Sequence, residues 1–311
     1  MTAESFPPGA DESLSKLGNA ISAQLQHLDS RPVEAGLYLV ATPIGNLSDI
    51  TLRALHILAR ANVVYCEDTR QTRKLMERYA LQSQLRSYHD HNADRERPRL
   101  LATLAAGKVV ALVSDAGTPL VSDPGHKLVR EARAANILVR AIPGPSAVLA
   151  GLTVSGLEID RFFFEGFLPS KGAARRDRLA RLQDVPGTLV FYEAPGRLAA
   201  TLVDLHKVLG DRMAIATREL TKRHEEHRSG SLSELAAYYE ATAVRGEIVI
   251  LVAPPSKQAD VDDDTIRNAL TGLRGTMSLR DASRELAGHF GIPRKRIYDL
   301  GLAQGSGDGE T

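Results

Sequence analysis

The sequence predicts an α/β protein that consists of two α/β domains followed by a small helical module. Three observations support this prediction. Short apolar runs alternate with stretches of helical periodicity from about residue 36, the same alternation starts again after residue 160, and a polar segment with three consecutive aspartates precedes a last group of short helices. Strands that alternate with helices are typical of a parallel sheet covered by helices.

The first α/β domain is expected over residues 36–153. Its apolar runs are short and end at turn residues such as Thr42 and Pro43, which is typical of buried parallel strands. We expect strands at residues 37–41, 62–66, 109–113 and 137–142, and helices at 52–60 and 126–135. Because ligands of open α/β sheets bind beyond the carboxyl ends of the strands, a site is expected in the loops that follow these runs.

The second α/β domain is expected over residues 160–254. Its strands are predicted at residues 161–167, 188–192, 212–217 and 247–252, with helices at 175–182 and 197–209. Pro254, Pro255 and the run of Asp262, Asp263 and Asp264 are typical of a polar linker.

Both ends of the chain are expected to differ from the α/β domains. Short helices at residues 265–273, 279–290 and 294–300 predict a module like a helix-turn-helix over residues 265–302. Residues 1–35, with Pro7, Pro8 and Gly9 near their start, are predicted to be a disordered, mildly acidic leader, and residues 303–311 a disordered tail.

Composition excludes several classes of protein. The 311 residues are 43% apolar, enough for one or two ordinary cores, and they contain a single cysteine, Cys66, which excludes a disulfide framework and a cysteine-based zinc site within the chain. Neither a membrane span nor a secretion signal is apparent, so a cytoplasmic protein is expected. The net charge of +1 gives no global argument for a nucleic-acid partner, so such an argument depends on local clusters.

Three loops at predicted strand ends are candidate binding elements. Residues 41–49 match neither the dinucleotide-binding fingerprint nor the P-loop, and such a turn is often simple punctuation between a strand and a helix. In residues 114–125, Asp115 is placed to bind a ribose hydroxyl or an ammonium group, whereas Asp123 is expected to cap the helix that starts near Pro124. In residues 142–148, Ser146 either caps a helix or binds a ligand.

Eight sequence blocks, in this order, carry a resemblance to a known family. They are V-A-T-P-I-G-N-L-S-D-I-T-L-R-A, C-E-D-T-R, S-D-A-G-T-P-L-V-S-D-P-G, I-P-G-P-S-A, F-E-G-F-L-P, F-Y-E-A-P-G-R, A-I-A-T-R-E-L-T-K-R-H-E-E and R-G-E-I-V-I-L-V. The set resembles the tetrapyrrole-methylase-like class of S-adenosylmethionine methyltransferases over residues 37–254. Within that class it is similar to the bacterial 16S ribosomal RNA cytidine 2′-O-ribose methyltransferases.

This resemblance implies that S-adenosylmethionine binds in a cleft between the two α/β domains. It also implies a homodimer and an acceptor in the 16S ribosomal RNA of the small ribosomal subunit. Methyl transfer from an activated sulfonium needs no metal ion. The implied cofactor contacts of the first domain are Thr42, Pro43, Gly45, Asn46, Asp115, Ala116, Gly117, Thr118, Ser146 and Ala147. Those of the second domain are Phe167, Tyr192, Glu193, Gly246 and Glu247.

Methyl transfer from a sulfonium requires mainly that the acceptor oxygen is held in line, and such positioning can lower a barrier by about 7–11 kcal/mol. A ribose hydroxyl is a poor nucleophile, so a general base could add a factor of about 10²–10⁴. The candidates for this base are Glu67, Asp68, Tyr192, Glu193, Glu219 and Lys222. Structural roles remain open for several of them, because Glu67 and Asp68 could start a helix and Glu193 could pair with Arg197.

Two basic clusters support an RNA acceptor. Between residues 168 and 183 the only acidic residue is Asp177, and the terminal helices are also rich in arginine, although a solvated helix face is the usual role of such a run. The predicted RNA contacts are Lys171, Arg175, Arg176, Arg178, Arg181, Arg294, Lys295 and Arg296. Two alternatives stay open: methylation of a tetrapyrrole, and a ligand-sensing regulator that binds DNA through the helix-turn-helix.

Overall fold

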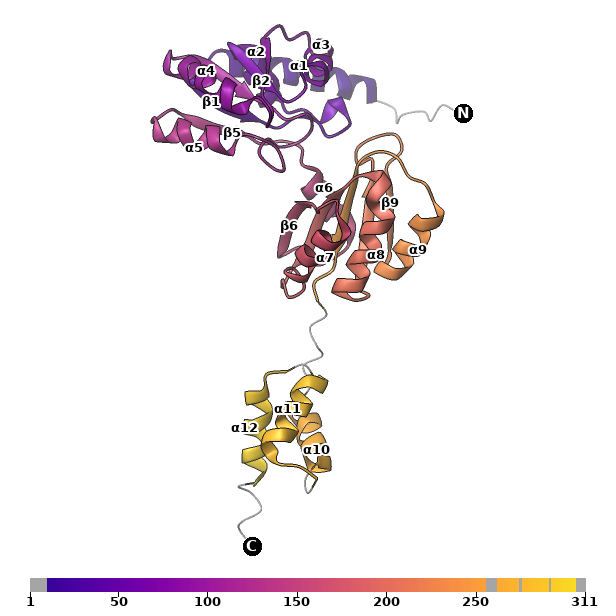
Figure 1. Ribbon diagram of the computed structural model, residues 1–311. Coiled ribbons are helices and arrows are strands. Elements are labelled where there is room, and N and C mark those ends of the chain that lie inside the picture. The colour runs from indigo at the N-terminus through magenta and orange to yellow at the C-terminus, as the bar shows by residue number, and fades with distance from the viewer. Residues whose placement is uncertain (1–9, 256–261, 274–275, 291, 306–311) are drawn as a thin grey trace. The chain divides into compact units, whose positions relative to one another are not determined.

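The computed structural model describes residues 10–255, 262–273, 276–290 and 292–305 (Figure 1). The chain divides between Ala253 and Pro254 into two compact units. The first unit contains both predicted α/β domains, each with a sheet of its own, and the second contains the terminal helices. The predicted α/β class is therefore confirmed. No helix of the described residues is long and apolar enough to cross a membrane.

The first sheet is parallel throughout, as predicted, with the strand order β3-β2-β4-β1-β5. Its strands are β1 (Gly36–Val40), β2 (Val63–Cys66), β3 (Gln84–Ser87), β4 (Val109–Leu112) and β5 (Val139–Ile142). Its helices are α2 (Leu52–Arg60), α3 (Thr69–Arg78), α4 (Ala93–Ala105) and α5 (His126–Ala134). Apolar side chains of α2 and α3 join one core cluster and those of α4 and α5 another, so the two pairs of helices cover opposite faces of the sheet.

The second sheet is mixed, with the order β6-β7-β10-β8-β9, and only β6 and β7 are parallel. Its strands are β6 (Phe162–Phe167), β7 (Thr188–Glu193), β8 (Met213–Arg218), β9 (Glu226–Ser231) and β10 (Ile248–Val252). Its helices are α7 (Gly172–Ala180), α8 (Leu198–Leu209) and α9 (Leu232–Ala241). These helices pack on one face of the sheet, where Phe191, Leu202 and Leu235 are buried together.

A helix between the two sheets, α6 (Ala147–Ser155), holds the halves of the first unit together. Its Val148 and Leu152 share a core cluster with Val249 and Leu251 of β10 and with Ile44 of the loop after β1. Because this cluster contains residues of both halves, the strand-end loops of the first sheet lie against the second sheet. This arrangement brings the predicted binding loops together.

The predicted disordered leader is wrong for residues 10–29, which form helix α1 (Ala10–Asp29). The carboxylate of Asp29 accepts hydrogen bonds from Arg60 at the end of α2 and so ties α1 to the first sheet's helices. The prediction gave too much importance to Pro7, Pro8 and Gly9, which precede the helix, and too little to the good helix formers that follow. Residues 1–9 lie outside the described residues.

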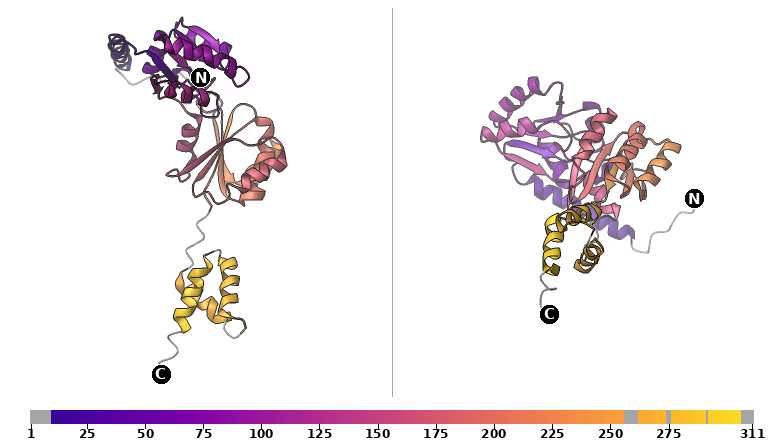
Figure 2. Two further views of the ribbon diagram at one scale, coloured as in Figure 1. Left: turned by 60° about the vertical axis from the view of Figure 1, so that its left-hand side comes forward. Right: turned by 60° about the horizontal axis from the view of Figure 1, so that its bottom comes forward.

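The second unit is a small three-helix module, which Figure 2 shows as a compact bundle. Its helices are α10 (Asp263–Leu273), α11 (Leu279–Phe290) and α12 (Arg294–Gly305), close to the predicted bounds. Ile266, Leu286 and Ile297 are buried in its core. The predicted disordered tail is wrong for residues 303–305, which continue α12, and residues 306–311 lie outside the described residues.

Candidate active site

Two adjoining pockets lie at the strand ends of the first unit. The first, here called the strand-end pocket, has a volume of about 390 Å³ and includes the end of β6 and residues of the loops after β1, β4, β5, β7 and β8. The second, here called the α3 pocket, has a volume of about 370 Å³ and lies between the loop after β1 and helix α3. The two pockets share Ile44, Asp115, Ala116 and Glu247, so they have one wall in common.

The strand-end pocket gathers most of the predicted cofactor contacts. The predicted residues that line it are Asp115, Ala116, Gly117, Thr118, Ser146, Ala147, Phe167, Tyr192, Glu193, Gly246 and Glu247. Thr42, Pro43 and Gly45 line the α3 pocket instead, and Asn46 lines neither. The side chain of Asn46 caps the short helix at Leu47–Asp49 by accepting a hydrogen bond from the amide of Ser48, and its cofactor contact stays a prediction.

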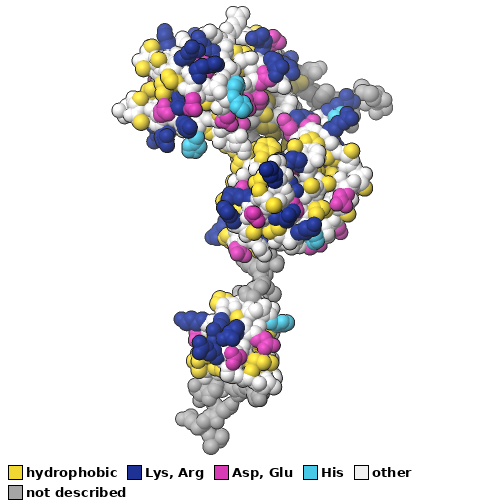
Figure 3. All heavy atoms as spheres, viewed as in Figure 1, with side chains coloured by type: hydrophobic (Ala, Val, Ile, Leu, Met, Phe, Trp, Pro, Cys, Tyr) yellow, Lys and Arg dark blue, Asp and Glu magenta, His cyan; other side chains and the backbone are white. Residues whose placement is uncertain are grey.

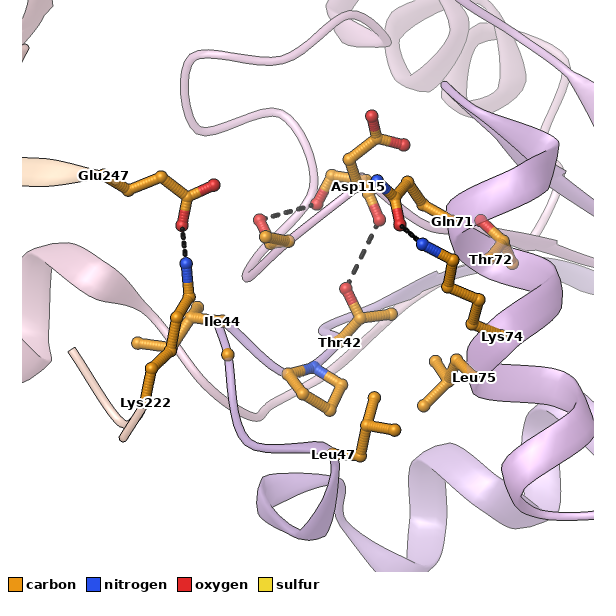
Figure 4. A pocket seen from close by; sticks show the side chains of 14 residues that line it. Thr42, Ile44, Leu47, Gln71, Thr72, Lys74, Leu75, Asp115, Lys222 and Glu247 are labelled. Atoms are coloured by element: carbon orange, nitrogen blue, oxygen red, sulfur yellow. Dashed lines mark hydrogen bonds and ion pairs between the residues drawn. The ribbon is translucent and has the colours of Figure 1, made fainter. Parts of the chain in front are cut away.

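The loops after β1 and β4 are held together by backbone hydrogen bonds. The amides of Thr42 and Gly117 each donate to the other residue's carbonyl, at 2.9 and 3.0 Å. The hydroxyl of Thr118 donates to the carbonyl of Pro145 at 3.1 Å and so connects the loop after β5. Figure 4 shows a further bond, from the Thr42 hydroxyl to the Ser114 carbonyl at 3.3 Å. The floor of both pockets is therefore pre-formed.

Asp115 belongs to the wall that both pockets share, and Figure 4 shows its side chain at the α3 pocket. One of its carboxylate oxygens accepts a hydrogen bond from the amide of Asp68 at 2.8 Å. The residue is exposed, and none of the described residues donates a hydrogen bond to its other oxygen. Asp115 can therefore bind a ligand with one oxygen while the other holds the start of α3.

Aromatic side chains form one side of the strand-end pocket. The Tyr192 ring packs against Phe164 and Phe167, with ring centroids 4.9 and 5.5 Å apart. Burial, with a contribution from the charge of Asp123, raises the pKa of Tyr192 to about 12. Because the phenol stays protonated at neutral pH, Tyr192 is unsuited to be the general base and instead offers an apolar face for a planar ring.

Asp123 has a different role from the predicted helix cap. Helix α5 has Gly125 at its N-cap without a side-chain bond, whereas Asp123 lines the strand-end pocket. Burial, together with the negative charges of Glu67, Asp115 and Asp90, raises the pKa of Asp123 to about 6, although a hydrogen bond with Ser114 opposes the shift. A carboxyl group that changes its charge near neutral pH in a pocket is a candidate for proton transfer. Sequence reasoning missed this role because the following Pro124-Gly125 suggested a helix start.

Of the predicted bases, Glu67 and Asp68 stand outside both sets of pocket-lining residues. Asp68 is the N-cap of α3, and hydrogen bonds with Arg70 lower its pKa to about 2. Burial, with the charges of Asp115 and Asp90, raises the pKa of Glu67. The alternative that Asp68 starts a helix is thus confirmed, and its low pKa makes it a weak base.

Glu193 is buried and fully engaged by its own half of the unit. Its carboxylate accepts hydrogen bonds from the Thr201 hydroxyl at 2.6 Å and the Ala194 amide at 2.8 Å. It also pairs with Arg197, whose Nε lies 3.1 Å from Oε1. The structural alternative is confirmed here too: Glu193 shapes the end of β7, and its carboxylate is not available as a base.

Lys222 lies between two carboxylates at the α3 pocket. Its Nζ donates to Glu219 at 2.8 Å and to Glu247 at 3.0 Å, the second bond being visible in Figure 4. Burial lowers the pKa of Lys222, but the hydrogen bonds with both glutamates outweigh burial and raise the pKa overall. A lysine that stays charged is a poor general base, so Lys222 acts as a cation.

Two glycines permit the close approach of the loops around Lys222. A Cβ on Gly45 would lie 2.5 Å from the Cγ of Lys222, and one on Gly246 would lie 2.3 Å from a carboxylate oxygen of Glu219. Gly246 also has a φ of +95°, while Glu219 and Thr221 adopt positive φ without being glycine. Strained backbone of this kind is typical of functional loops.

The predicted RNA contacts of α7 are largely engaged by acidic residues from other elements. Arg175 is buried, with its Nη2 2.7 Å from Asp204 of α8, so its predicted phosphate contact is wrong. Arg176 pairs with the same carboxylate at 3.2 Å, and Arg178 pairs with Glu165 of β6 at 2.5 Å. Lys171 and Arg181 are exposed, and no ion pair joins them to a described residue.

In the three-helix module, Arg294 and Lys295 are exposed at the start of α12. Arg296 pairs with Asp263 of α10 at 2.7 Å, which stabilises the module itself. Figure 3 shows Lys and Arg side chains together on one face of this module. The module therefore presents positive charge, although Arg296 contributes less of it than the sequence suggested.

Comparisons with known proteins agree with this geometry. Residues 36–236 match the family of tetrapyrrole (corrin/porphyrin) methylases, and residues 259–305 match the RsmI C-terminal HTH domain. A ribosomal RNA small subunit methyltransferase I of Mesorhizobium japonicum is 49% identical over 91% of this chain and 98% of its own length. The protein of the same name from Escherichia coli O157:H7 is 40% identical over 90% of this chain and 99% of its own length.

Solved structures extend the likeness to the fold. A cobalt precorrin-4 methyltransferase covers 70% of this chain and 94% of its own, with a TM-score of 0.55 and 16% identity. A uroporphyrin-III C-methyltransferase from Thermus thermophilus, complexed with S-adenosylhomocysteine, covers 70% of this chain and 97% of its own, with a TM-score of 0.51 and 25% identity.

Proposed function

Because this chain belongs to the ribosomal RNA small subunit methyltransferase I family, within the tetrapyrrole methylases, we propose that it transfers a methyl group from S-adenosylmethionine to a cytidine ribose 2′-oxygen of 16S ribosomal RNA. The single observation that carries the proposal is the match of both the methylase region and the terminal module to this family. Methylation of a tetrapyrrole and regulation of transcription are less favoured, because neither alternative is named by relatives that cover about nine tenths of the chain.

The strand-end pocket fits the proposed cofactor in size and in chemistry. Its volume lies within the range of about 300–1,000 Å³ that is usual for small-molecule sites. Ile44, Val121 and Tyr192 offer apolar surface for an adenine ring, and Asp115 offers a carboxylate oxygen for a ribose hydroxyl or an ammonium group. The carboxylates of Asp115 and Asp123 also favour a positive sulfonium.

When bound, S-adenosylmethionine supplies a methyl group that its sulfonium already activates. The protein's own contribution is then to position the acceptor, exclude water and receive a proton. The hydrogen-bonded loops around Thr42 and Gly117 give a rigid floor for positioning. Asp123 is the carboxylate best suited to accept the hydroxyl proton, because it lines the pocket and titrates near neutral pH. We also propose that the enzyme acts as a homodimer in the cytoplasm.

The proposal is tested with purified protein, methyl-labelled S-adenosylmethionine and one of three acceptors: small ribosomal subunits without this methylation, a uroporphyrin-type tetrapyrrole, or duplex DNA. We expect label in the subunit RNA alone, and 2′-O-methylcytidine after nuclease digestion and mass spectrometry. Label on a base, on the tetrapyrrole, or on none of the acceptors would contradict the proposal.

Asp115→Ala provides a matched test of the cofactor site. Losing a hydrogen bond to a charged group costs about 1.5–3 kcal/mol, so the affinity for S-adenosylmethionine should fall by about 10- to 150-fold. Asp184→Ala, which removes an exposed carboxylate after α7, should leave the affinity unchanged. Calorimetry that gives a folded Asp115→Ala protein with the affinity of the parent would remove Asp115 from the site.

A further inference from the structure

The α3 pocket is a second cavity beside the strand-end pocket, and the cofactor contacts described above leave most of it unused. Helix α3 contributes Gln71, Thr72, Lys74 and Leu75 to its lining, and Lys222 lies on the other side (Figure 4). The wall around Asp115 and Ala116 separates it from the strand-end pocket. A ligand here would therefore lie directly beside a ligand in the strand-end pocket.

Helix α3 also carries an exposed basic face that leads to this pocket. Its sequence, T-R-Q-T-R-K-L-M-E-R, contains four cations and one acidic residue, Glu77. Arg70 pairs with Asp68, but no ion pair joins Arg73, Lys74 or Arg78 to any described residue, and all three are exposed. In Figure 3, Lys and Arg side chains gather over the helices that Figure 1 labels α2 to α4.

The spacing of these cations places them along one side of the helix. Arg70, Lys74 and Arg78 follow one another at intervals of four residues, and residues so spaced are neighbours on a helix surface. Lys74 belongs to this row and also lines the α3 pocket, where its Nζ donates to the Gln71 side chain at 3.1 Å. The row of positive charge therefore runs into the pocket.

We propose that the α3 pocket receives the acceptor nucleotide of a single-stranded RNA segment, and that the exposed cations of α3 bind the phosphates that lead to it. This inference rests on the proposed function. A nucleotide in this pocket would be unstacked from its neighbours, as enzymes that act on a nucleotide commonly require. The pocket volume of about 370 Å³ lies in the range of small-molecule sites, and the shared wall would place the ribose beside the cofactor.

The charges in and around the pocket suit a ribose and phosphate. Lys74 is a cation without a carboxylate partner among the described residues, so it can pair with a phosphate without first breaking an ion pair. Lys222 is held by Glu219 and Glu247, which fixes its position at the opposite side. A cation without a carboxylate partner loses no ion pair when it binds a phosphate. Each phosphate that is neutralised in this way also releases condensed counterions, which favours binding.

The first test removes the three unpaired cations together, in Arg73→Ala/Lys74→Ala/Arg78→Ala. The binding of unmodified 16S ribosomal RNA is measured by filter retention between 0.1 and 1 M salt. Each contact contributes about 0.7 to the logarithmic salt slope for single strands, so the slope should fall by about 2 and the affinity at 0.1 M salt by about 100-fold. The helix should still fold, because alanine is the best helix former and none of the three side chains is buried.

The matched control removes three cations from the opposite face of the first sheet, in Lys127→Ala/Arg130→Ala/Arg133→Ala on α5. This control should keep the parent's slope and affinity, which separates a local contact from a general loss of positive charge. If both triple variants lose RNA affinity equally, or if neither does, α3 is not the phosphate contact and the inference is overturned.

The second test fills the α3 pocket by the substitution Gln71→Trp. Gln71 is exposed, and it lines the α3 pocket but not the strand-end pocket. Methyl transfer to small ribosomal subunits should fall by at least tenfold while the calorimetric affinity for S-adenosylmethionine stays unchanged. Full activity of a folded Gln71→Trp protein would show that the acceptor does not enter this pocket. If the parent protein transfers no methyl group to RNA, the proposed function itself is wrong. The activity of the parent therefore tests the proposed function, and the activity of Gln71→Trp relative to the parent tests the acceptor pocket.

Discussion

Replacing Asp123 by asparagine should make the free protein more stable at neutral pH. Burial raises the pKa of Asp123 from its ordinary 3.8 to about 6, which means that the folded protein disfavours its charge. For an acid whose pKa is raised on folding, the stabilising contribution is complete below the ordinary pKa and is lost as the pH rises through the folded pKa. The charged carboxylate therefore lowers the free energy of unfolding above about pH 6.

The size of the effect follows from the shift. Two pKa units correspond to about 3 kcal/mol, and partial solvent access to the side chain reduces this to about 1–2 kcal/mol. Asp123→Asn should then raise the melting temperature by about 3–6 °C at pH 8, and by about half as much at pH 5, where much of the carboxyl group is already protonated.

The same substitution should weaken the enzyme. Asparagine can neither accept the hydroxyl proton nor favour the sulfonium charge, so the rate of methyl transfer should fall within the range of about 10²–10⁴ that a general base provides. Asp184→Asn, at an exposed position, serves as the control for both measurements. Equal melting temperatures of parent and Asp123→Asn at pH 8 would refute the argument that this carboxylate is held in an unfavourable environment.

Three further substitutions test a buried ion pair and a strained loop in the second half of the first unit. Arg175→Ala leaves the buried carboxylate of Asp204 without its main partner, so urea unfolding should show a loss of about 3–5 kcal/mol, whereas Arg176→Ala on the exposed side of the same carboxylate should cost less than about 1 kcal/mol. Gly246→Ala forces a Cβ against Glu219 at a φ of +95° and should destabilise the protein by about 1–3 kcal/mol, and a melting temperature equal to the parent's would show that the loop relaxes freely.

The sequence predicted the strands that carry apolar runs, including the edge strands β5 and β6, but it did not predict the edge strands β3 and β9. Runs such as Val109–Leu112 and Ile248–Val252 are buried on both faces, and only such strands are apolar at every position. β3 and β9 lie at sheet edges, where Arg86 and Arg228 are tolerated because one side of each strand meets no other strand. Their sequences therefore carry no continuous apolar run, and both strands were missed.

The loops that line the strand-end pocket could be located because their position depends on local sequence. Residues 115–118 and 146–147 follow predicted strands, and both loops line this pocket. The roles of single carboxylates were harder to predict, since they depend on groups far away in the sequence. Asp123 owes its raised pKa partly to Glu67 and Asp90, which approach it only because β2 and β3 end at the same edge of the sheet.

The two basic helices show why a count of charges along the sequence misleads. The segment 168–183, which contains α7, has five cations against one acidic residue, but Asp204 and Glu165 come from α8 and β6 and engage three of those cations. Helix α3 is similarly basic, yet none of the described residues brings a carboxylate into an ion pair with Arg73, Lys74 or Arg78. An arginine that is already paired and buried gains little from a phosphate, because it must first leave its partner. What distinguishes an RNA contact from a structural ion pair is thus the charge of the elements packed against the helix, which only the fold reveals.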